Sequence, residues 1–287
     1  MSKSTSDAAR YFTQGEKIGS ETPYGENINV GKYVLADDAR IYYEVYGKGT
    51  PILILHGGGV GTPYELGKIL DELKKTHKII VMSTRGHGKS EIGHSKLTYK
   101  QKADDALAIL DDLGLKEPIQ LFGFSDGAYT AYEIAALYPE RVERITAIGA
   151  GTLKAGYFSA DSLKLSELEK IDKQFIDAQK KIRPEPERYQ EFCDSYMEFW
   201  SKHSVGEETF GKIKCPVLLI VGDEDDHAPI STVLEAHKLI ANSRLCVVPK
   251  AWHTAFLDNY EVTSAAIFQF VNAKLKTLTP SRIVEAK

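Results

Sequence analysis

The chain has 287 residues, of which 43% are hydrophobic and 26% charged, and its formal net charge is −4. These values are typical of a globular protein whose core is large enough for one α/β domain. They exclude a general nucleic-acid binder, which needs a basic face. The first residues are polar and no apolar run is long enough to span a bilayer, so we expect a soluble, cytoplasmic protein without membrane contact. A signal sequence removed earlier would leave no trace.

The cysteines are three in number and lack the spacing of metal ligands; they are Cys193, Cys215 and Cys246. Cys215 and Cys246 begin or lie within apolar runs, where cysteine behaves as a small hydrophobic residue. We therefore expect three free structural thiols, and no metal or other cofactor in the chemistry.

Residues 1–32 are polar and Gly-rich, and they predict an N-terminal arm on the surface. Two runs then flank an Asp-Asp-Ala turn and predict an antiparallel pair of strands. Apolar strand-like runs next alternate with helical patterns, which predicts a parallel sheet covered by helices on both faces. The expected strands lie at 33–35, 41–46, 52–55, 78–82, 119–124, 142–148, 217–221 and 245–248. The expected helices lie near 62–73, 99–113, 128–138, 230–240 and 262–275.

The alternation stops between residues 152 and 211, which are charged and helix-like without a strand pattern. This interruption predicts a helical cap inserted into an α/β core formed by residues 33–151 and 212–276. We expect residues 277–287 to form a C-terminal tail outside this core.

Residues 123–127 read Gly-Phe-Ser-Asp-Gly and lie between an apolar strand and a helix. This is the G-x-S-x-G pattern, in which the serine occupies a sharp, strained turn at the end of a strand. Side chains at 123 and 127 would collide with neighbouring backbone, which explains the two glycines. The pentapeptide alone is common, but its position between strand and helix makes Ser125 the predicted nucleophile.

Residues 56–59 read His-Gly-Gly-Gly at the end of the first buried strand. Attack by a serine on a carbonyl requires backbone N–H donors that face the developing oxyanion. We expect these donors to be the N–H groups of Gly58 and Asp126. A phosphate-binding loop is the competing interpretation, but the Lys-Ser/Thr ending of a P-loop is absent. His56 is expected to be a hydrogen-bonded structural residue.

The general base should follow the last strand, where His253 lies. The orienting acid should follow an earlier strand, and residues 223–226 read Asp-Glu-Asp-Asp after Gly222. The third residue after such a glycine points back toward the histidine, so we choose Asp225 over its neighbours. The other three acids are expected to form a solvated loop.

Residues 33–271 resemble the α/β-hydrolase superfamily, in its branch with a helical cap. The matching features are His56–Gly59, Arg85–Ser90, the Ser125 turn, Gly222–Pro229 and the His253 loop, in the expected order. One departure is Ser83, at a position that is commonly Asp in this family; that position is usually structural, as is the Arg85–Ser90 turn. The resemblance implies a mostly parallel eight-stranded sheet.

The resemblance also implies a serine hydrolase that cleaves a carboxylic ester of a small molecule through an acyl-enzyme intermediate. A carbon–carbon bond hydrolase, an amino-acid ester hydrolase or a peptidase would use the same triad. A ligand-sensing protein or interaction module with little turnover is the alternative from another class. The serine argues against haloalkane dehalogenases and epoxide hydrolases, which place a carboxylate at the turn.

Substrate-binding residues are predicted at Asp126, Tyr196 and Trp200. The Ser-Asp-Gly sequence is similar to that of valacyclovir hydrolase, an amino-acid ester hydrolase, which implies that Asp126 would contact a substrate ammonium group. A carboxylate beside an oxyanion is unfavourable unless it is paired, so a structural role for the Asp126 side chain is the favoured interpretation. Aromatic residues on one helical face of the cap are expected mainly to pack; they are Tyr189, Phe192, Tyr196, Phe199 and Trp200.

Overall fold

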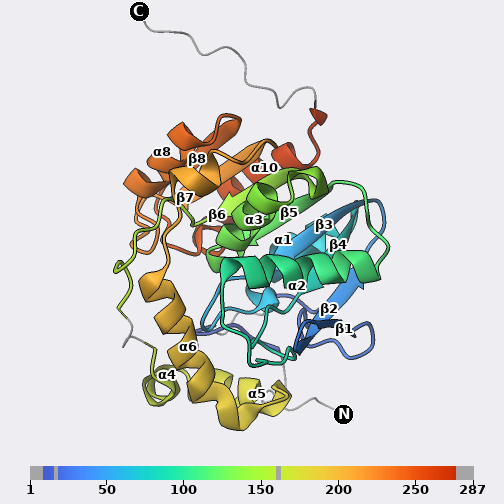
Figure 1. Ribbon diagram of the computed structural model, residues 1–287, viewed down its shortest axis with the longest axis vertical. Coiled ribbons are helices and arrows are strands. Elements are labelled where there is room, and N and C mark those ends of the chain that lie inside the picture. The colour runs from blue at the N-terminus through green and yellow to red at the C-terminus, as the bar shows by residue number, and fades with distance from the viewer. Residues whose placement is uncertain (1–8, 16–18, 160–162, 276–287) are drawn as a thin grey trace, which may run out of the picture.

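The computed structural model describes residues 9–15, 19–159 and 163–275 (Figure 1). Its eight strands form one sheet in the order β1-β2-β4-β3-β5-β6-β7-β8. They are β1 (Lys32–Ala36), β2 (Ala39–Tyr46), β3 (Thr50–Leu55), β4 (His77–Met82), β5 (Ile119–Phe124), β6 (Val142–Ile148), β7 (Val217–Gly222) and β8 (Ser243–Val248). β2 pairs antiparallel with β1 and β4, and the other pairs are parallel. The predicted mostly parallel eight-stranded sheet is confirmed.

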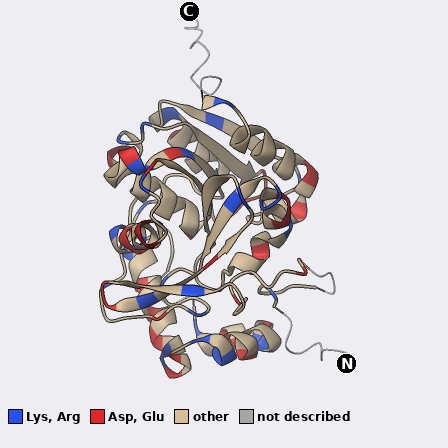
Figure 2. Ribbon diagram, turned by 90° about the vertical axis from the view of Figure 1, so that its right-hand side faces the viewer, with Lys and Arg blue, Asp and Glu red and all other residues tan. Residues whose placement is uncertain are grey.

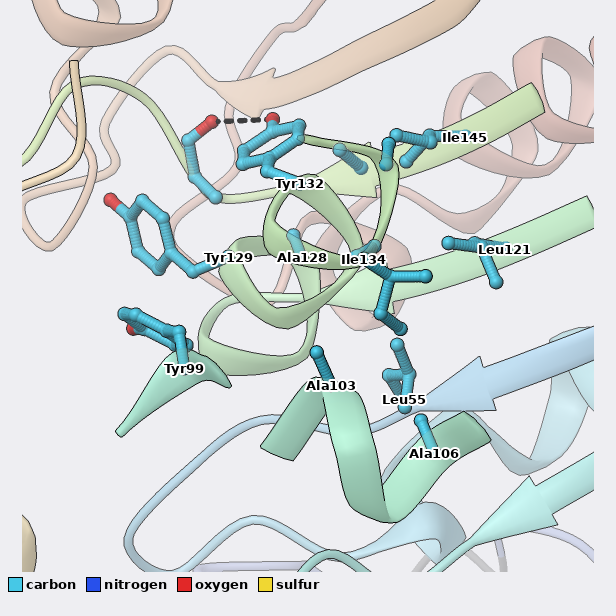
Figure 3. Close-up of a cluster of buried hydrophobic side chains, with 14 of the residues drawn as sticks. Leu55, Tyr99, Ala103, Ala106, Leu121, Ala128, Tyr129, Tyr132, Ile134 and Ile145 are labelled. Atoms are coloured by element: carbon cyan, nitrogen blue, oxygen red, sulfur yellow. Dashed lines mark hydrogen bonds between the residues drawn. The ribbon is translucent and has the colours of Figure 1, made fainter. Parts of the chain in front are cut away.

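Helices cover both faces of this sheet. The core helices are α1 (Gly67–Leu73), α2 (Tyr99–Asp112), α3 (Asp126–Leu137), α8 (Ile230–Leu239), α9 (Ala255–Asp258) and α10 (Tyr260–Val271). Alternate residues of β3 belong to different apolar clusters, because successive side chains of a strand point to opposite faces. Leu53 and Leu55 pack with α2 and α3, whereas Ile52 and Ile54 pack with α1 and α10. Figure 3 shows Leu55 beside α2 and α3 on the first of these faces.

The helix expected at 62–73 begins differently from the prediction. Its first turn, Pro63–Leu66, is a 3-10 helix, and the Thr62 side chain makes no capping hydrogen bond. Glu65 keeps its contact with the N–H of Thr62 and also accepts a hydrogen bond from the N–H of Gly57, at 3.1 Å. The side chain that the sequence assigned to a helix cap therefore fixes the loop after β3.

Among the described residues between β6 and β7, four α-helices are present. They are α4 (Leu165–Ile171), α5 (Lys173–Ile182), α6 (Tyr189–Lys202) and α7 (Glu207–Phe210). We call residues 152–211 the helical insertion; α4, α5 and α6 lie together at one end of the molecule (Figure 1). An antiparallel bridge between Leu153 and Val205 joins the two ends of the insertion. The aromatic stripe of α6 mainly packs, as expected, because Tyr189, Phe192 and Tyr196 are buried in the cluster between these helices.

The predicted surface arm over residues 1–32 is partly buried, contrary to expectation. Tyr24 is fully buried against the sheet and its hydroxyl donates to Asp71, at 2.9 Å. The buried carboxylate of Glu44 accepts the N–H of Gly25, at 2.9 Å. Isolated aromatic residues among polar ones produce no periodic pattern, so this contact could not be predicted from the sequence. Residues 1–8 and 16–18 of the arm, and the tail 277–287, lie outside the described residues.

The three cysteines are free. Burial raises the pKa of the Cys193 thiol to about 11 and that of Cys215 to about 12. Both thiols therefore stay protonated at neutral pH, in agreement with the expected structural role.

Charged residues of both signs are distributed along the outer helices and loops (Figure 2). Across the described ranges, no helix is both long enough and apolar enough to cross a membrane.

Arg85 links the β1–β2 hairpin to α2. Its side chain is buried and donates to both carboxylate oxygens of Asp105, at 2.9 and 2.8 Å, and to Asp38, at 2.5 Å. Two residues earlier, the carbonyl of Ser83 accepts the hydroxyl proton of Ser90, at 2.6 Å. The Arg85–Ser90 segment is thus a structural turn, as expected.

Replacing Arg85 with Ala should lower the free energy of unfolding by about 3–5 kcal/mol, because it leaves the Asp105 carboxylate buried without its cation. Urea unfolding followed by circular dichroism measures this loss. Arg40→Ala is the matched control, since Arg40 is exposed and also pairs with a carboxylate, that of Glu91. Equal effects of the two substitutions would contradict the structural role of Arg85.

Candidate active site

Ser125 lies in the turn between β5 and α3. Its backbone has φ 51° and ψ −118°, a strained conformation for a residue with a side chain. A Cβ on Gly123 would lie 2.5 Å from the backbone of Ala128, and one on Gly127 would lie 2.2 Å from the carbonyl oxygen of Leu55. Both glycines are therefore required by close backbone approach, which fixes Ser125 at the carboxyl edge of the sheet.

His253 and Asp225 form a hydrogen-bonded line with Ser125. The Nε2 atom of His253 lies 2.9 Å from Ser125 Oγ, and its Nδ1 lies 3.0 Å from each carboxylate oxygen of Asp225. Asp225 is buried and also accepts the N–H groups of His227 and Ala228, at 2.9 and 2.8 Å. The three residues come from the loops after β5, β7 and β8, which meet at one edge of the parallel sheet.

Asp225 holds the tautomer of His253. Burial alone would raise the pKa of Asp225, but the hydrogen bond and charge of His253 and the two backbone N–H groups bring it below its ordinary value. An ionised carboxylate accepts a proton donated by Nδ1–H, so Nε2 is left unprotonated toward the Ser125 hydroxyl. The other acids of this loop, Asp223, Glu224 and Asp226, are exposed.

His227 lies over the ring of His253, which the sequence did not reveal. The two ring centroids are 4.7 Å apart and the planes differ by 21°. Together with Asp225, these histidines have ligand atoms within 4.8 Å of one another. In a stacked pair, however, the nitrogen lone pairs lie in parallel planes and do not converge, so this geometry suits a hydrogen-bonded triad better than a metal ion.

The predicted oxyanion donors belong to the start of α3 and to the loop after β3. Asp126 is the first residue of α3, where a backbone N–H has no acceptor within its own helix. Gly58 lies in the loop after β3, where a Cβ would come within 2.6 Å of both the Tyr196 hydroxyl and the Trp200 ring. Close packing of α6 is thus a second reason for glycine at position 58.

The Asp126 side chain is engaged inside the protein. Its carboxylate accepts Lys102 Nζ at 2.6 Å, the Tyr196 hydroxyl at 2.5 Å and the Trp200 indole N–H at 3.0 Å. Burial alone would raise the pKa of Asp126, but the charge and hydrogen bond of Lys102 and the two further donors hold it below its ordinary value. We call these four residues the Asp126 cluster.

These contacts correct the substrate-binding prediction for the side chains of Asp126 and Tyr196. The ammonium group of Lys102 occupies the position beside the carboxylate that a substrate ammonium would take. Tyr196 is fully buried and its hydroxyl contacts both Asp126 and Lys102. Lys102 was missed because a lysine in an amphipathic helix normally marks the solvent side, and no motif singles it out.

Trp200 does border the space in front of the nucleophile. That cavity has a volume of about 20 Å³. Its lining residues are Tyr99, Ser125, Asp126, Tyr129, Gly149, Leu153, Phe158, Trp200, His227 and His253. It is large enough for about one water molecule, so side chains of the insertion have to move before a substrate binds. Tyr99 also lines a second cleft of about 480 Å³, between residues 92–100 and α6.

His56 is structural, as expected. The N–H of Thr84 donates to its Nε2, at 3.0 Å, and its Nδ1 lies 2.6 Å from the carbonyl oxygen of Gly57. Burial lowers the pKa of His56 to about 4, so the ring is neutral and supports the loop that carries Gly58.

A mostly parallel sheet with a serine at a strained strand-to-helix turn defines an α/β hydrolase. Residues 50–180 match the family described as alpha/beta hydrolase fold. The AB hydrolase superfamily protein YisY of Bacillus subtilis is 27% identical over 273 residues, which are 85% of this chain and 100% of that protein. The chain has the α/β-hydrolase fold, and these matches to hydrolases support its assignment to the α/β-hydrolase superfamily and to the hydrolase class of enzymes.

Two further similarities concern proteins with named substrates or activities. The 2-hydroxy-6-oxo-6-(2'-aminophenyl)hexa-2,4-dienoic acid hydrolase of Metapseudomonas resinovorans is 20% identical, covering 92% of this chain and 97% of that protein. The solved structure of the esterase EaEST from Exiguobacterium antarcticum has a TM-score of 0.69 and 24% identity, covering 85% of this chain and 100% of that one. At this identity the structural similarity shows the fold.

Glu65 should make stability depend on pH. Burial raises its pKa from 4.5 to about 8, although the N–H groups of Gly57 and Thr62 oppose this. An acid whose pKa is raised on folding contributes a stability that is fully present below its unfolded pKa and is lost as pH rises toward 8. Glu65→Gln keeps the acceptor and removes the charge, so its gain in Tm over wild type should be larger at pH 9 than at pH 5.

Thermal unfolding of both proteins at the two pH values measures this difference. Glu117→Gln is the control, because Glu117 is exposed. A gain that is the same at both pH values would show that Glu65 does not titrate with a raised pKa.

Proposed function

We propose that the chain is a serine hydrolase that cleaves a carboxylic ester of a small molecule through an acyl-enzyme intermediate. The observation that carries this proposal is the hydrogen-bonded line from Ser125 through His253 to the buried Asp225. A histidine so oriented serves as a base toward the serine and as an acid toward a leaving group. We further propose that the helical insertion acts as a cap over this site.

In the first half-reaction, Ser125 Oγ attacks the ester carbonyl while His253 Nε2 takes the hydroxyl proton. Asp225 stabilises the resulting imidazolium, and the N–H groups of Gly58 and Asp126 donate to the oxyanion. The tetrahedral intermediate collapses, and His253 returns the proton to the departing alkoxide. In the second half-reaction His253 removes a proton from water, which attacks the acyl-enzyme and releases the carboxylic acid.

The residues that line the cavity favour a substrate with an uncharged group at the reacting carbon. Aromatic and apolar side chains predominate, and the described lining contains no lysine or arginine. Among the described lining residues of this cavity, the carboxylate is that of Asp126, which pairs with Lys102. An amino-acid ester with a free ammonium group would compete with Lys102 for this carboxylate, so simple esters fit better.

Cleavage of a carbon–carbon bond is the second candidate, and the relative from Metapseudomonas resinovorans favours it. A dienoic acid carries a carboxylate, which in a partly dry site requires a cation or several N–H donors. The absence of lysine and arginine from the described cavity lining therefore supports the ester. Turnover of such a dienoic acid without turnover of any ester would favour carbon–carbon bond cleavage over ester cleavage.

Ser125→Ala should lower kcat for a p-nitrophenyl ester by at least about 10³-fold, because it removes the nucleophile and leaves only binding and the oxyanion donors. Release of p-nitrophenol measures the rate, and circular dichroism checks the fold. The variant should also lose labelling by a fluorophosphonate. Activity and labelling near those of wild type would exclude Ser125 as the nucleophile.

Asp225→Asn should lower kcat by about 10⁴-fold, as removal of the orienting carboxylate does in serine proteases. The amide no longer holds the His253 tautomer that accepts the serine proton. Asp223→Asn is the matched control in the same loop, because Asp223 is exposed and its carboxylate contacts the N–H of Ala251. Similar small losses in both variants would place the orienting acid elsewhere.

A further inference from the structure

Two side chains of α6 reach into the core beside the nucleophile. Tyr196 donates its hydroxyl proton to one carboxylate oxygen of Asp126, and Trp200 donates its indole N–H to the other. Asp126 directly follows Ser125, and its backbone N–H is one of the two proposed oxyanion donors. The residue that bears this N–H is therefore held through its side chain by the helical insertion.

The same two side chains contact the residue with the other proposed donor. A Cβ on Gly58 would lie 2.6 Å from the Tyr196 hydroxyl and 2.6 Å from the Trp200 ring. Both side chains therefore pack directly against the loop after β3. The rings of Tyr196 and Trp200 also pack edge to face, with centroids 4.9 Å apart. The loops after β3 and β5, far apart in the chain, thus share one partner in α6.

Lys102 holds the cluster from the opposite side. From α2, its Nζ contacts Asp126 at 2.6 Å and the Tyr196 hydroxyl at 2.7 Å. Lys102, Asp126 and Tyr196 are all at least 99% buried. A buried ion pair adds little net stability because both charges lose their hydration, so this one is better explained by the orientation it imposes.

We propose that Tyr196 and Trp200 are positioning residues that set the oxyanion hole through Asp126 and Gly58. This inference rests on the proposed serine hydrolase function. When α6 lies against the core, it holds both residues that bear the proposed oxyanion donors; when α6 moves away, the Asp126 carboxylate loses two donors and both loops loosen. Closure of the insertion is thereby coupled to stabilisation of the transition state.

Room for a substrate can come from elsewhere in the cavity wall. Phe158 and Leu153 line the same space in front of Ser125 and have no side-chain hydrogen-bonding group to lose on moving. Tyr196 and Trp200 can therefore stay on Asp126 while the acyl group is bound. Rate enhancement then depends on α6 staying against the core while Phe158 and Leu153 move to admit the substrate.

The test is Tyr196→Phe, which removes only the hydroxyl. We expect kcat for a p-nitrophenyl ester to fall by about 10-fold or more with KM nearly unchanged, because the loss is confined to the transition state. Affinity for phenylboronic acid, which forms a tetrahedral anion on the serine, should fall by a similar factor. Tyr189→Phe is the matched control: it lies on the same helix, is buried, and its hydroxyl has no hydrogen bond within the described residues.

Wild-type kcat and boronate affinity in Tyr196→Phe would overturn the proposal, as would equal losses in Tyr189→Phe. If Tyr196→Phe does not fold, Trp200→Phe removes the second donor and keeps an aromatic ring, with the same expectations. Fluorophosphonate labelling separates this proposal from the proposed function. Labelling that survives Ser125→Ala would refute the function, whereas labelled Tyr196→Phe with unchanged kcat would refute only the positioning role.

Discussion

The close approach of α3 to the end of β3 is the constraint on which the site depends. A Cβ on Gly127 would lie 2.2 Å from the carbonyl oxygen of Leu55, so the helix can begin there only without a side chain at that position. The chain must therefore turn within one residue, and Ser125 adopts a positive φ to make that turn. The same approach places the first N–H of α3 beside the loop of Gly58. The positions of Ser125 and of the Asp126 N–H thus follow from one packing contact between a helix and a strand.

The sequence predicts those parts of the molecule whose local pattern has one physical explanation. A continuous apolar run such as Ile52–Leu55 is typical of a buried strand, and the glycines around Ser125 are typical of a tight turn. Asp225 was separable from three neighbouring acids because the turn at Gly222 directs a single side chain toward His253. In each case the information lies within a few residues.

The remaining features depend on contacts between distant segments, which leave no local pattern. Lys102 in α2 becomes a buried cation only because Asp126 lies opposite, and Tyr24 becomes a core residue only because the sheet leaves space for it. Glu65 forms half of a capping box, and it also supports the loop after β3, which no local pattern indicates. The positions of polar residues are the hardest to predict from sequence, because the same side chain lies in solvent when it has no partner and in the core when it is paired.

The triad has a consequence for how such an enzyme can change over evolution. All three of its residues come from loops at one edge of the sheet, and the helical insertion contributes none of them. An insertion of different length or composition could therefore be exchanged between β6 and β7 without disturbing the hydrogen-bonded line of Ser125, His253 and Asp225. α6 limits this freedom, since any replacement must bring hydrogen-bond donors to Asp126 or leave a buried carboxylate and lysine without their partners. New specificity is thus more readily acquired in the segments on either side of α6 than in the helix itself.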